Sequence, residues 1–222
     1  LVAPVGVASA AAPTITLSAS SGPAAIVDPA GNTILSSTII VKGSGFAAGQ
    51  TGITIRIVSS DTTPSPTAGA QLKLDRPTIQ TGPANSVDAD ANGMFQARVH
   101  IINIANGEIT GGSKLIFAVY TPAGGVATTT AGVPFTVTAA VVIKTAAGAT
   151  SGSFGDVFNF YCSGFDASES ISLTPSGMFT GVPAAVGANG AVDTAVSITM
   201  GPISGGSKTV TVTGATSGRS AT

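Results

Sequence analysis

The chain has few charged residues, one histidine, one cysteine and no tryptophan. Asp, Glu, Lys and Arg make up 9% of its 222 residues, and the formal net charge is −1. An ordinary globular domain carries about a quarter charged residues, and nucleic-acid binding needs a basic face. The composition therefore argues against a nucleic-acid partner. The single Cys162 excludes an internal disulfide.

The sequence also lacks long apolar runs and helix signals. No apolar run approaches the roughly 20 residues of a membrane-spanning helix, although the mean hydropathy is +0.47. We therefore expect no membrane span. Short alternating segments lie between recurring Gly and Pro residues, for example Ile53–Ile57 and Lys208–Thr213. Such alternation predicts an all-β sandwich fold.

Three landmarks recur in the same order in the two halves of the chain. Lys42–Phe46 aligns with Tyr161–Phe165, the pair Asn92-Gly93 with Asn189-Gly190, and Gly111–Lys114 with Gly205–Lys208. A repeat of this kind predicts two copies of one structural unit. We expect an N-terminal arm at residues 1–12, a first domain at 13–138 with insertions near 22–37 and 59–80, and an incomplete second domain at 139–222.

The second domain is predicted to be incomplete because its last strand has no counterpart. The first half closes with Val133–Ala139, whereas the second stops at Thr222, just before the equivalent segment. The N-terminus aligns with that segment, with Pro4 on Pro134 and Val5 in the place of Phe135. A sandwich without an edge strand exposes unpaired backbone groups and an apolar groove, which an added strand satisfies.

These ends predict a donor strand and an acceptor groove. The donor residues are Ala3, Pro4, Val5 and Val7, and the groove residues are Phe158, Phe160, Val210 and Val212. The tether between the arm and the first strand, Ala10–Pro13, spans only roughly 13 Å. The arm must then reach another copy, and a contact that does not close on itself builds a filament. The alternative is that residues 1–12 are a linker and the second domain is truncated.

In the first half, a strand that ends with Gly43–Phe46 is followed by a turn and another strand, and Gly111–Lys114 follows later. This order of elements resembles the Ig-like repeats of prokaryotic secreted and S-layer-type proteins. Two such domains with an N-terminal strand resemble the subunits of archaeal thread filaments. The resemblance implies a structural subunit of an extracellular pilus-like or thread-like filament that assembles by donor-strand complementation. Such a homopolymer would serve adhesion or biofilm formation through surface or cell–cell contacts.

A secreted filament subunit would have lost its leader from this numbering, because Leu1–Pro4 has no basic region typical of a signal peptide. The alternative function is an Ig-like binding module of an S-layer protein or adhesin. Such a module would hold a carbohydrate or protein through the 59–80 loop. We expect no enzyme activity and no cofactor.

No catalytic or metal site is expected either. Asp88–Gly93 begins like an EF-hand loop, but its twelfth position is Val99 where the motif needs Glu. We interpret it as a turn. His100 shares the outward parity of Gln96 and Arg98, and Cys162 has inward parity between outward-facing neighbours that include Tyr161. Four lysines are expected to lie in solvent at strand ends: Lys42, Lys114, Lys144 and Lys208. The alternative for these lysines is an isopeptide cross-link.

Overall fold

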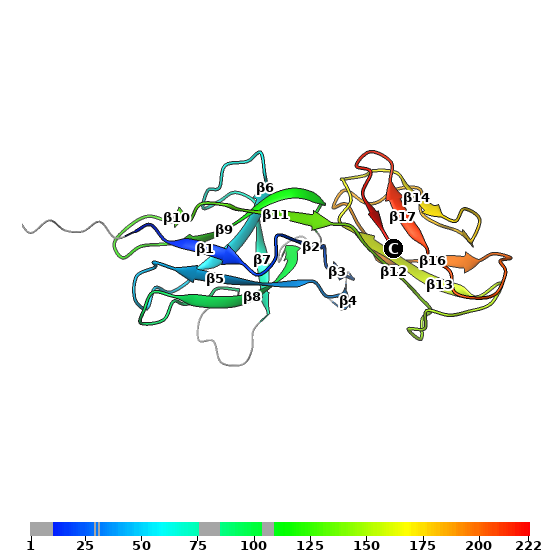
Figure 1. Cartoon of the computed structure of the whole chain (residues 1–222), viewed down its shortest axis with the longest axis horizontal. Helices are drawn as coiled ribbons and strands as arrows, with labels where there is room; N and C mark the ends of the chain where they lie inside the picture. Colours follow the sequence, from blue (N-terminus) through cyan, green and yellow to red (C-terminus); the bar gives the residue numbers. More distant parts are fainter. Residues whose placement is uncertain (1–10, 29, 31, 76–84, 104–108) are drawn as a thin grey trace, which may run out of the picture.

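The computed structural model describes residues 11–28, 30, 32–75, 85–103 and 109–222. These residues form strands and turns without a helix. Within this part of the chain, no helix is long and apolar enough to span a bilayer. The strands build two β-sandwiches that lie end to end (Figure 1). The predicted all-β fold with two sandwiches is therefore confirmed. The predicted arm lies outside the described residues except for Ala11 and Ala12.

The first sandwich has two faces that share one strand. One face contains β1 (Thr14–Leu17), β5 (Thr38–Ser44), β8 (Phe95–Asn103) and β7 (Ala70–Asp75). The other contains β6 (Thr54–Ser59), β9 (Gly112–Tyr120), β11 (Val133–Thr138) and β2 (Ser21–Pro23). The strand β7 pairs with both β8 and β6, so part of the predicted 59–80 insertion is a strand that joins the faces.

Short elements complete the first sandwich. The strand β10 (Thr128–Thr129) pairs with the end of β9. A separate hairpin consists of β3 (Ile26–Val27) and β4 (Thr33–Leu35). This hairpin belongs to the insertion predicted near 22–37, and it lies on the side of the first sandwich that meets the second (Figure 1).

The second sandwich is smaller. One sheet has the order β12 (Ala140–Lys144), β13 (Val157–Ser163), β16 (Val192–Met200) and β15 (Phe179–Thr180). The other has the order β14 (Ile171–Thr174), β17 (Thr211–Gly214) and β18 (Ser220–Ala221). The strand β12 is therefore an edge strand, and the facing sheet has three strands.

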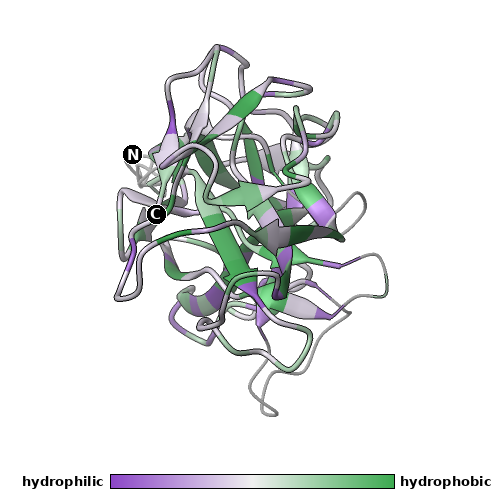
Figure 2. Cartoon of the chain, turned by 90° about the vertical axis from the view of Figure 1, so that its right-hand side faces the viewer, coloured by the Kyte–Doolittle hydropathy of each residue, from purple (hydrophilic) through white to green (hydrophobic). Residues whose placement is uncertain are grey.

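Alternating apolar residues fill the space between the sheets of each sandwich. In β11, Phe135 and Val137 are buried, whereas Pro134, Thr136 and Thr138 are exposed. Burying such an apolar side chain contributes about 1.5–3 kcal/mol. Figure 2, which looks onto the end of the second sandwich, shows hydrophobic residues concentrated in the strands and hydrophilic residues mostly in the loops. The two sandwiches have separate main cores.

The glycine landmarks have a common structural cause in the two sandwiches. Gly93 and Gly190 both have a positive φ, of 70° and 74°. A Cβ atom at Gly93 would lie 2.1 Å from the carbonyl oxygen of Phe46, and one at Gly190 would lie 2.2 Å from that of Phe165. Only glycine permits this backbone and this approach. The repeat seen in the sequence therefore preserves a packed turn.

Two exposures implied by the predicted outward orientations need correction. Tyr161 lies on the outward face of β13, as expected, but it is only 6% exposed because the β3–β4 hairpin of the first sandwich covers it. His100 is partly buried and not fully solvated, since β7 pairs beside it and brings Asp75 Oδ1 to 3.9 Å from its Nε2. Both errors arise from an insertion that covers an outer face.

A candidate strand-acceptor groove

The candidate site lies where the two sandwiches differ. In the first, the initial half of β9 pairs with β11, from Gly112 opposite Val137 to Ile116 opposite Val133. The shared Gly-Gly-Ser-Lys landmark makes residues 206–210 the counterpart of that half-strand. In the second sandwich, all of which the structure describes, no strand pairs with residues 206–210. An edge that is paired in one sandwich is thus unpaired in the other.

The hairpin β17–β18 does not replace the missing partner. In the second sandwich, Ala221 pairs with Val212. The residue equivalent to Val212 in the first sandwich is Ala118, and its carbonyl oxygen accepts a hydrogen bond from the Thr130 N–H at 3.0 Å. Ala221 therefore corresponds to Thr130, which precedes β11. Within residues 139–222, nothing takes the place of Val133–Thr138.

A groove of about 1050 Å³ runs beside this edge. The edge strand β12 forms one wall through Val141 and Ile143. The opposite wall consists of the segment from Ile203 to Val210, together with Thr222. Apolar side chains from the strands and the adjoining turns also line the groove: Phe154, Phe158, Met178, Phe179 and Met200. The groove therefore opens between the two sheets at the position that β11 fills in the first sandwich.

The predicted site residues fall into three groups. Phe158 and Val210 line the groove. Phe160 and Val212 are fully buried in the core below and do not line it. The predicted donor residues Ala3, Pro4, Val5 and Val7 lie outside the described residues. The sequence reasoning missed the walls from β12 and from Met200 to Ile203, although the Gly205–Lys208 landmark marks this region.

Equivalent isoleucines show the effect of the unpaired edge. Ile109 precedes the landmark in the first sandwich and is 7% exposed in its core. Its counterpart Ile203 is 37% exposed and lines the groove. The polar contact beside them is the same in both sandwiches: Lys114 Nζ donates to Thr110 Oγ1 at 3.1 Å, and Lys208 Nζ donates to Ser204 Oγ at 2.9 Å. The turn is retained while the apolar cover differs.

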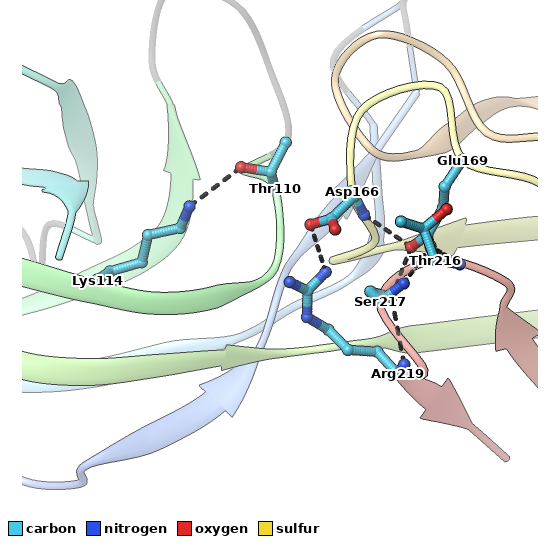
Figure 3. Close-up of polar contacts among 7 residues, drawn as sticks. All are labelled: Thr110, Lys114, Asp166, Glu169, Thr216, Ser217 and Arg219. Carbon is cyan, nitrogen blue, oxygen red and sulfur yellow. Dashed lines mark hydrogen bonds and ion pairs between the residues drawn. The ribbon is translucent and has the colours of Figure 1, made fainter. Parts of the chain in front are cut away.

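A carboxylate fixes the turn between β17 and β18 (Figure 3). Glu169 accepts hydrogen bonds from the N–H groups of Asp166, Thr216 and Ser217 and from Ser217 Oγ, at 2.7 to 3.2 Å. Burial raises the pKa of Glu169, but these hydrogen bonds outweigh burial and hold the pKa below its ordinary value. Arg219 Nη1 lies 2.7 Å from Asp166 Oδ1 in the same turn.

Local packing and hydrogen bonds account for the surroundings of three further titratable residues, Asp90, Cys162 and His100. Asp90 Oδ1 accepts hydrogen bonds from the N–H groups of Asn92 and Met94, so this carboxylate stabilises the turn before β8. Burial raises the pKa of Cys162 to about 12, which keeps the thiol protonated. Burial also lowers the pKa of His100. In the part of the chain that the structure describes, no group of three His, Cys, Asp or Glu side chains is placed to hold a metal ion.

The lysines differ in their surroundings. The pKa of Lys114 is lowered, first by burial and then by the nearby Arg219, so this lysine is not the solvated residue that the sequence predicted. Its Nζ donates a hydrogen bond to the hydroxyl of Thr110, as described above, whereas an isopeptide link requires an Asn or Asp partner. The isopeptide alternative thus gains no support from this contact.

The chain matches no protein-family model and no curated protein. Among solved structures, it is similar to the C-terminal 282-residue fragment of intimin in complex with the intimin-binding domain of the translocated intimin receptor. The similarity covers 95% of this chain and 62% of the intimin chain, with 15% sequence identity and a TM-score of 0.30.

Proposed function

We propose that this protein is a structural subunit of an extracellular filament, in which an N-terminal strand of one copy fills the groove of the next. The observation that supports the proposal is the unpaired edge at residues 206–210 beside an apolar groove of about 1050 Å³. The same edge in the first sandwich carries β11. Adhesion or biofilm formation through surface contacts would be the biological role of such a filament.

The chemistry of the groove suits an extended peptide. A strand that pairs with residues 206–210 gains main-chain hydrogen bonds, and its alternate side chains enter the groove. In β11 the inward positions are held by Val133, Phe135 and Val137. Ala3, Val5 and Val7 have the same spacing in the arm. Two inserted valines would each contribute up to about 1.5–3 kcal/mol, and the alanine less.

The arm leaves the first sandwich at the end opposite to the groove. The backbone of residues 11–13 passes beside Gly45, where a Cβ atom would lie 3.4 Å from Pro13 Cα. Gly45 lies just beyond the end of β5, and the equivalent end of β13 is the one that faces the first sandwich, because Ser163 Oγ contacts it there. The end of β5 beside Gly45 is therefore the end of the first sandwich that faces away from the second. Residues 11–13, to which the rest of the arm is attached, therefore have the whole first sandwich between them and the groove of their own chain. Insertion into a neighbouring copy follows, and repeated insertion gives an open chain of subunits.

The test is assembly of the 222-residue chain and of two matched variants, measured by sedimentation and negative-stain microscopy. Val5→Asp places a charge at the position of buried Phe135, and Ala8→Asp places the same charge at the position of exposed Thr138. Burial of an unpaired charge is strongly unfavourable. We expect filaments from the unmodified chain and from Ala8→Asp, and monomers from Val5→Asp and from a deletion of residues 1–10.

Filaments from the deletion variant would contradict the proposal. So would an unmodified chain that stays monomeric at high concentration and whose groove does not bind a peptide of residues 1–12. In that case a strand from a longer form of the same chain, or another protein, is the occupant of the groove.

A further inference from the structure

The two sandwiches of one chain meet through an apolar contact. The hairpin β3–β4 of the first sandwich packs on the outer face of β12 and β13, in a cluster formed by Ile26, Ile34, Leu35, Ala140, Val142 and Tyr161. Beside this cluster, Ser163 Oγ donates a hydrogen bond to the carbonyl oxygen of Ala24 at 3.1 Å. This contact explains why Tyr161 is buried although it faces away from its own core.

The same junction includes a close backbone approach. The Gly111 N–H donates to the carbonyl oxygen of Phe165 at 3.2 Å. A Cβ atom at Gly111 would lie 1.9 Å from the carbonyl oxygen of Gly164, and one at Gly112 would lie 2.8 Å from Arg219 Nη2. Contact between the sandwiches thus requires glycine at position 111, whereas Gly112, like Gly206, also has a positive φ that the local turn itself demands.

Because the sandwiches are repeats, parts of this junction have counterparts at the outer ends of the chain, although the hairpin β3–β4 has none, since no strand lies between β12 and β13. We define the arm end as the loops 46–52, 88–94 and 121–127 with the adjoining ends of β1 and β5. Thr16, Lys42 and Ser44 of the arm end correspond to Val142, Tyr161 and Ser163. These three residues line an open surface pocket of about 650 Å³, together with Met94 and Phe95.

We define the far end as the loops 150–156 and 201–207 of the second sandwich. When the two sequences are aligned with Gly45 opposite Gly164, strand β5 lies opposite strand β13. In this alignment Phe154 lies opposite Leu35, three residues before the strand in each case. Leu35 packs in the junction, whereas Phe154 is 73% exposed. Residues 204–206 correspond likewise to Thr110–Gly112 and include the second Gly-Gly pair. The arm end therefore repeats the face that β12 and β13 present to the junction, and the far end repeats its Gly-Gly turn and one apolar position, but not its hairpin. Among the described residues, neither of these repeated surfaces is covered as in the internal junction.

The exposed apolar side chains agree with this assignment. Five large hydrophobic residues are exposed in the part of the chain that the structure describes: Met94, Val126, Phe154, Val157 and Ile203. Met94 and Val126 belong to the arm end, whose loops are joined by the hydrogen bond from Gln50 Nε2 to the carbonyl oxygen of Thr121. The other three belong to the far end and the start of β13. Phe154 and Ile203 also line the groove, so the residues whose exposure the groove leaves unexplained are Met94 and Val126 at the arm end and Val157 at the start of β13.

We propose that the far end of one copy docks on the arm end of the next copy, in the manner of the internal junction. Phe154 would enter the pocket at Thr16, Lys42 and Ser44, and the Gly205 N–H would face the carbonyl oxygen of Phe46, as that of Gly111 faces Phe165. The aromatic ring fits this pocket because Lys42 offers both an aliphatic stem and a cation for the ring face. This inference rests on the proposed function and adds a second contact between subunits.

The length of the arm shows why such a contact matters. Val137 precedes Ala140, the first residue of β12, by three positions, whereas Val7 precedes Thr14, the first residue of β1, by seven. Four further residues add up to about 13 Å of reach. An inserted strand on this longer tether does not by itself fix the angle between subunits. A surface contact between the two ends is what would make the joint as defined as the internal junction.

The test uses charge at the two proposed partners. Phe154→Lys removes the aromatic ring and places a second cation beside Lys42, in a pocket that Asp88 and Asp90 also line. We expect it to raise the critical concentration for filament formation about tenfold, which corresponds to about 1.4 kcal/mol. Adding Lys42→Glu to that variant should restore assembly. Thr136→Lys adds the same charge on an exposed strand position away from both ends and should leave the critical concentration unchanged.

Strand insertion is measured separately in each variant, by disulfide formation between cysteines introduced at Ala3 and Val210. If the disulfide forms but Phe154→Lys assembles like the unmodified chain, or if Lys42→Glu fails to restore assembly, end-to-end docking is wrong while strand insertion stands. If the disulfide does not form even without Phe154→Lys, the proposed function fails and the docking with it.

Discussion

The two sandwiches of this chain share a framework but differ at one edge. In the first, residues 112–116 are paired with β11, and Phe135 and Val137 close the core. In the second, residues 206–210 have no strand partner and an apolar groove lies beside them. The turns and glycines around both edges are alike, but residues 114–116 pair with both β6 and β11, whereas their counterparts 208–210 pair with neither β14 nor a strand in the place of β11. The first sandwich thus serves as an internal reference for what the second lacks.

The largest expected effect comes from the isoleucines at equivalent positions beside this edge. Ile109→Ala should destabilise the first sandwich by about 2–5 kcal/mol, because the side chain is buried in its core. Ile203→Ala should cost less than about 1 kcal/mol in the unassembled chain, because the side chain is 37% exposed. Urea unfolding of the two variants followed by circular dichroism measures both. Equal losses would mean that the groove is already closed in the free subunit.

A smaller loss of stability is expected from substitutions at one equivalent position, four residues after Phe46 in the first sandwich and four residues after Phe165 in the second. It is Gln50 in the first sandwich and Glu169 in the second. Glu169→Gln replaces a charged acceptor of several hydrogen bonds and should cost about 1.5–3 kcal/mol. Gln50→Ala removes a neutral side-chain bond to the carbonyl oxygen of Thr121 and should cost about 0.5–1.5 kcal/mol.

The carboxylate also makes the second sandwich sensitive to acid. The pKa of Glu169 in the folded chain is lower than its ordinary value of 4.5. The unfolded chain therefore binds the proton more readily, so the stabilisation is fully present above pH 4.5 and is lost as the pH falls through the lower folded pKa. Thermal unfolding between pH 7 and pH 3 should show this loss in the unmodified chain. Glu169→Gln should lack it, and an unchanged pH profile in that variant would assign the loss to other groups.

The smallest effect is expected at the ion pair that the second sandwich has and the first lacks. Arg219 pairs with Asp166, whose counterpart in the first sandwich is Ala47. Both side chains are partly exposed, so Asp166→Asn should cost less than about 1 kcal/mol and still less at high salt. The comparison of unfolding midpoints at low and high salt checks this. A larger cost independent of salt would indicate that the pair fixes the junction with the first sandwich.

Much of this architecture could be predicted from the sequence. The alternation of apolar residues and the repeated Gly, Asn-Gly and Gly-Gly-Ser-Lys landmarks indicate two sandwiches, because each landmark serves a local turn or a close backbone approach. The same landmarks locate the edge beside which Phe158 and Val210 line a groove, and the role of these residues in accepting a strand stays a prediction. Local patterns of this kind can be recognised in the sequence because residues close together in the chain determine them.

The errors concern contacts between distant segments. Phe160 and Val212 have the same inward parity as the groove residues, but parity cannot distinguish the groove from the core beneath it. The burial of Tyr161 depends on a hairpin from residues 26–35 of the other sandwich. The partial burial of His100 depends on β7, in a segment predicted to be a loop. Such coverage follows from tertiary packing and leaves no signal near the residue concerned.

The register of the inserted strand is the central claim, and a disulfide tests it most directly. The alignment of the arm with β11 places Ala3 opposite Val210, as Val133 lies opposite Ile116. Facing residues of an antiparallel pair have Cα atoms about 4.5–5.5 Å apart, which suits a disulfide. The native Cys162 is buried with its pKa raised to about 12, so it will not compete.

The chain with Ala3→Cys and Val210→Cys should form a ladder of disulfide-linked oligomers on oxidation. The chain with Ala3→Cys and Lys208→Cys, two positions out of register, should remain largely unlinked, because diagonal neighbours lie about 7–8 Å apart. Oligomers of equal yield from both chains, or none from either, would contradict the proposed insertion of the arm into the groove of a neighbouring copy.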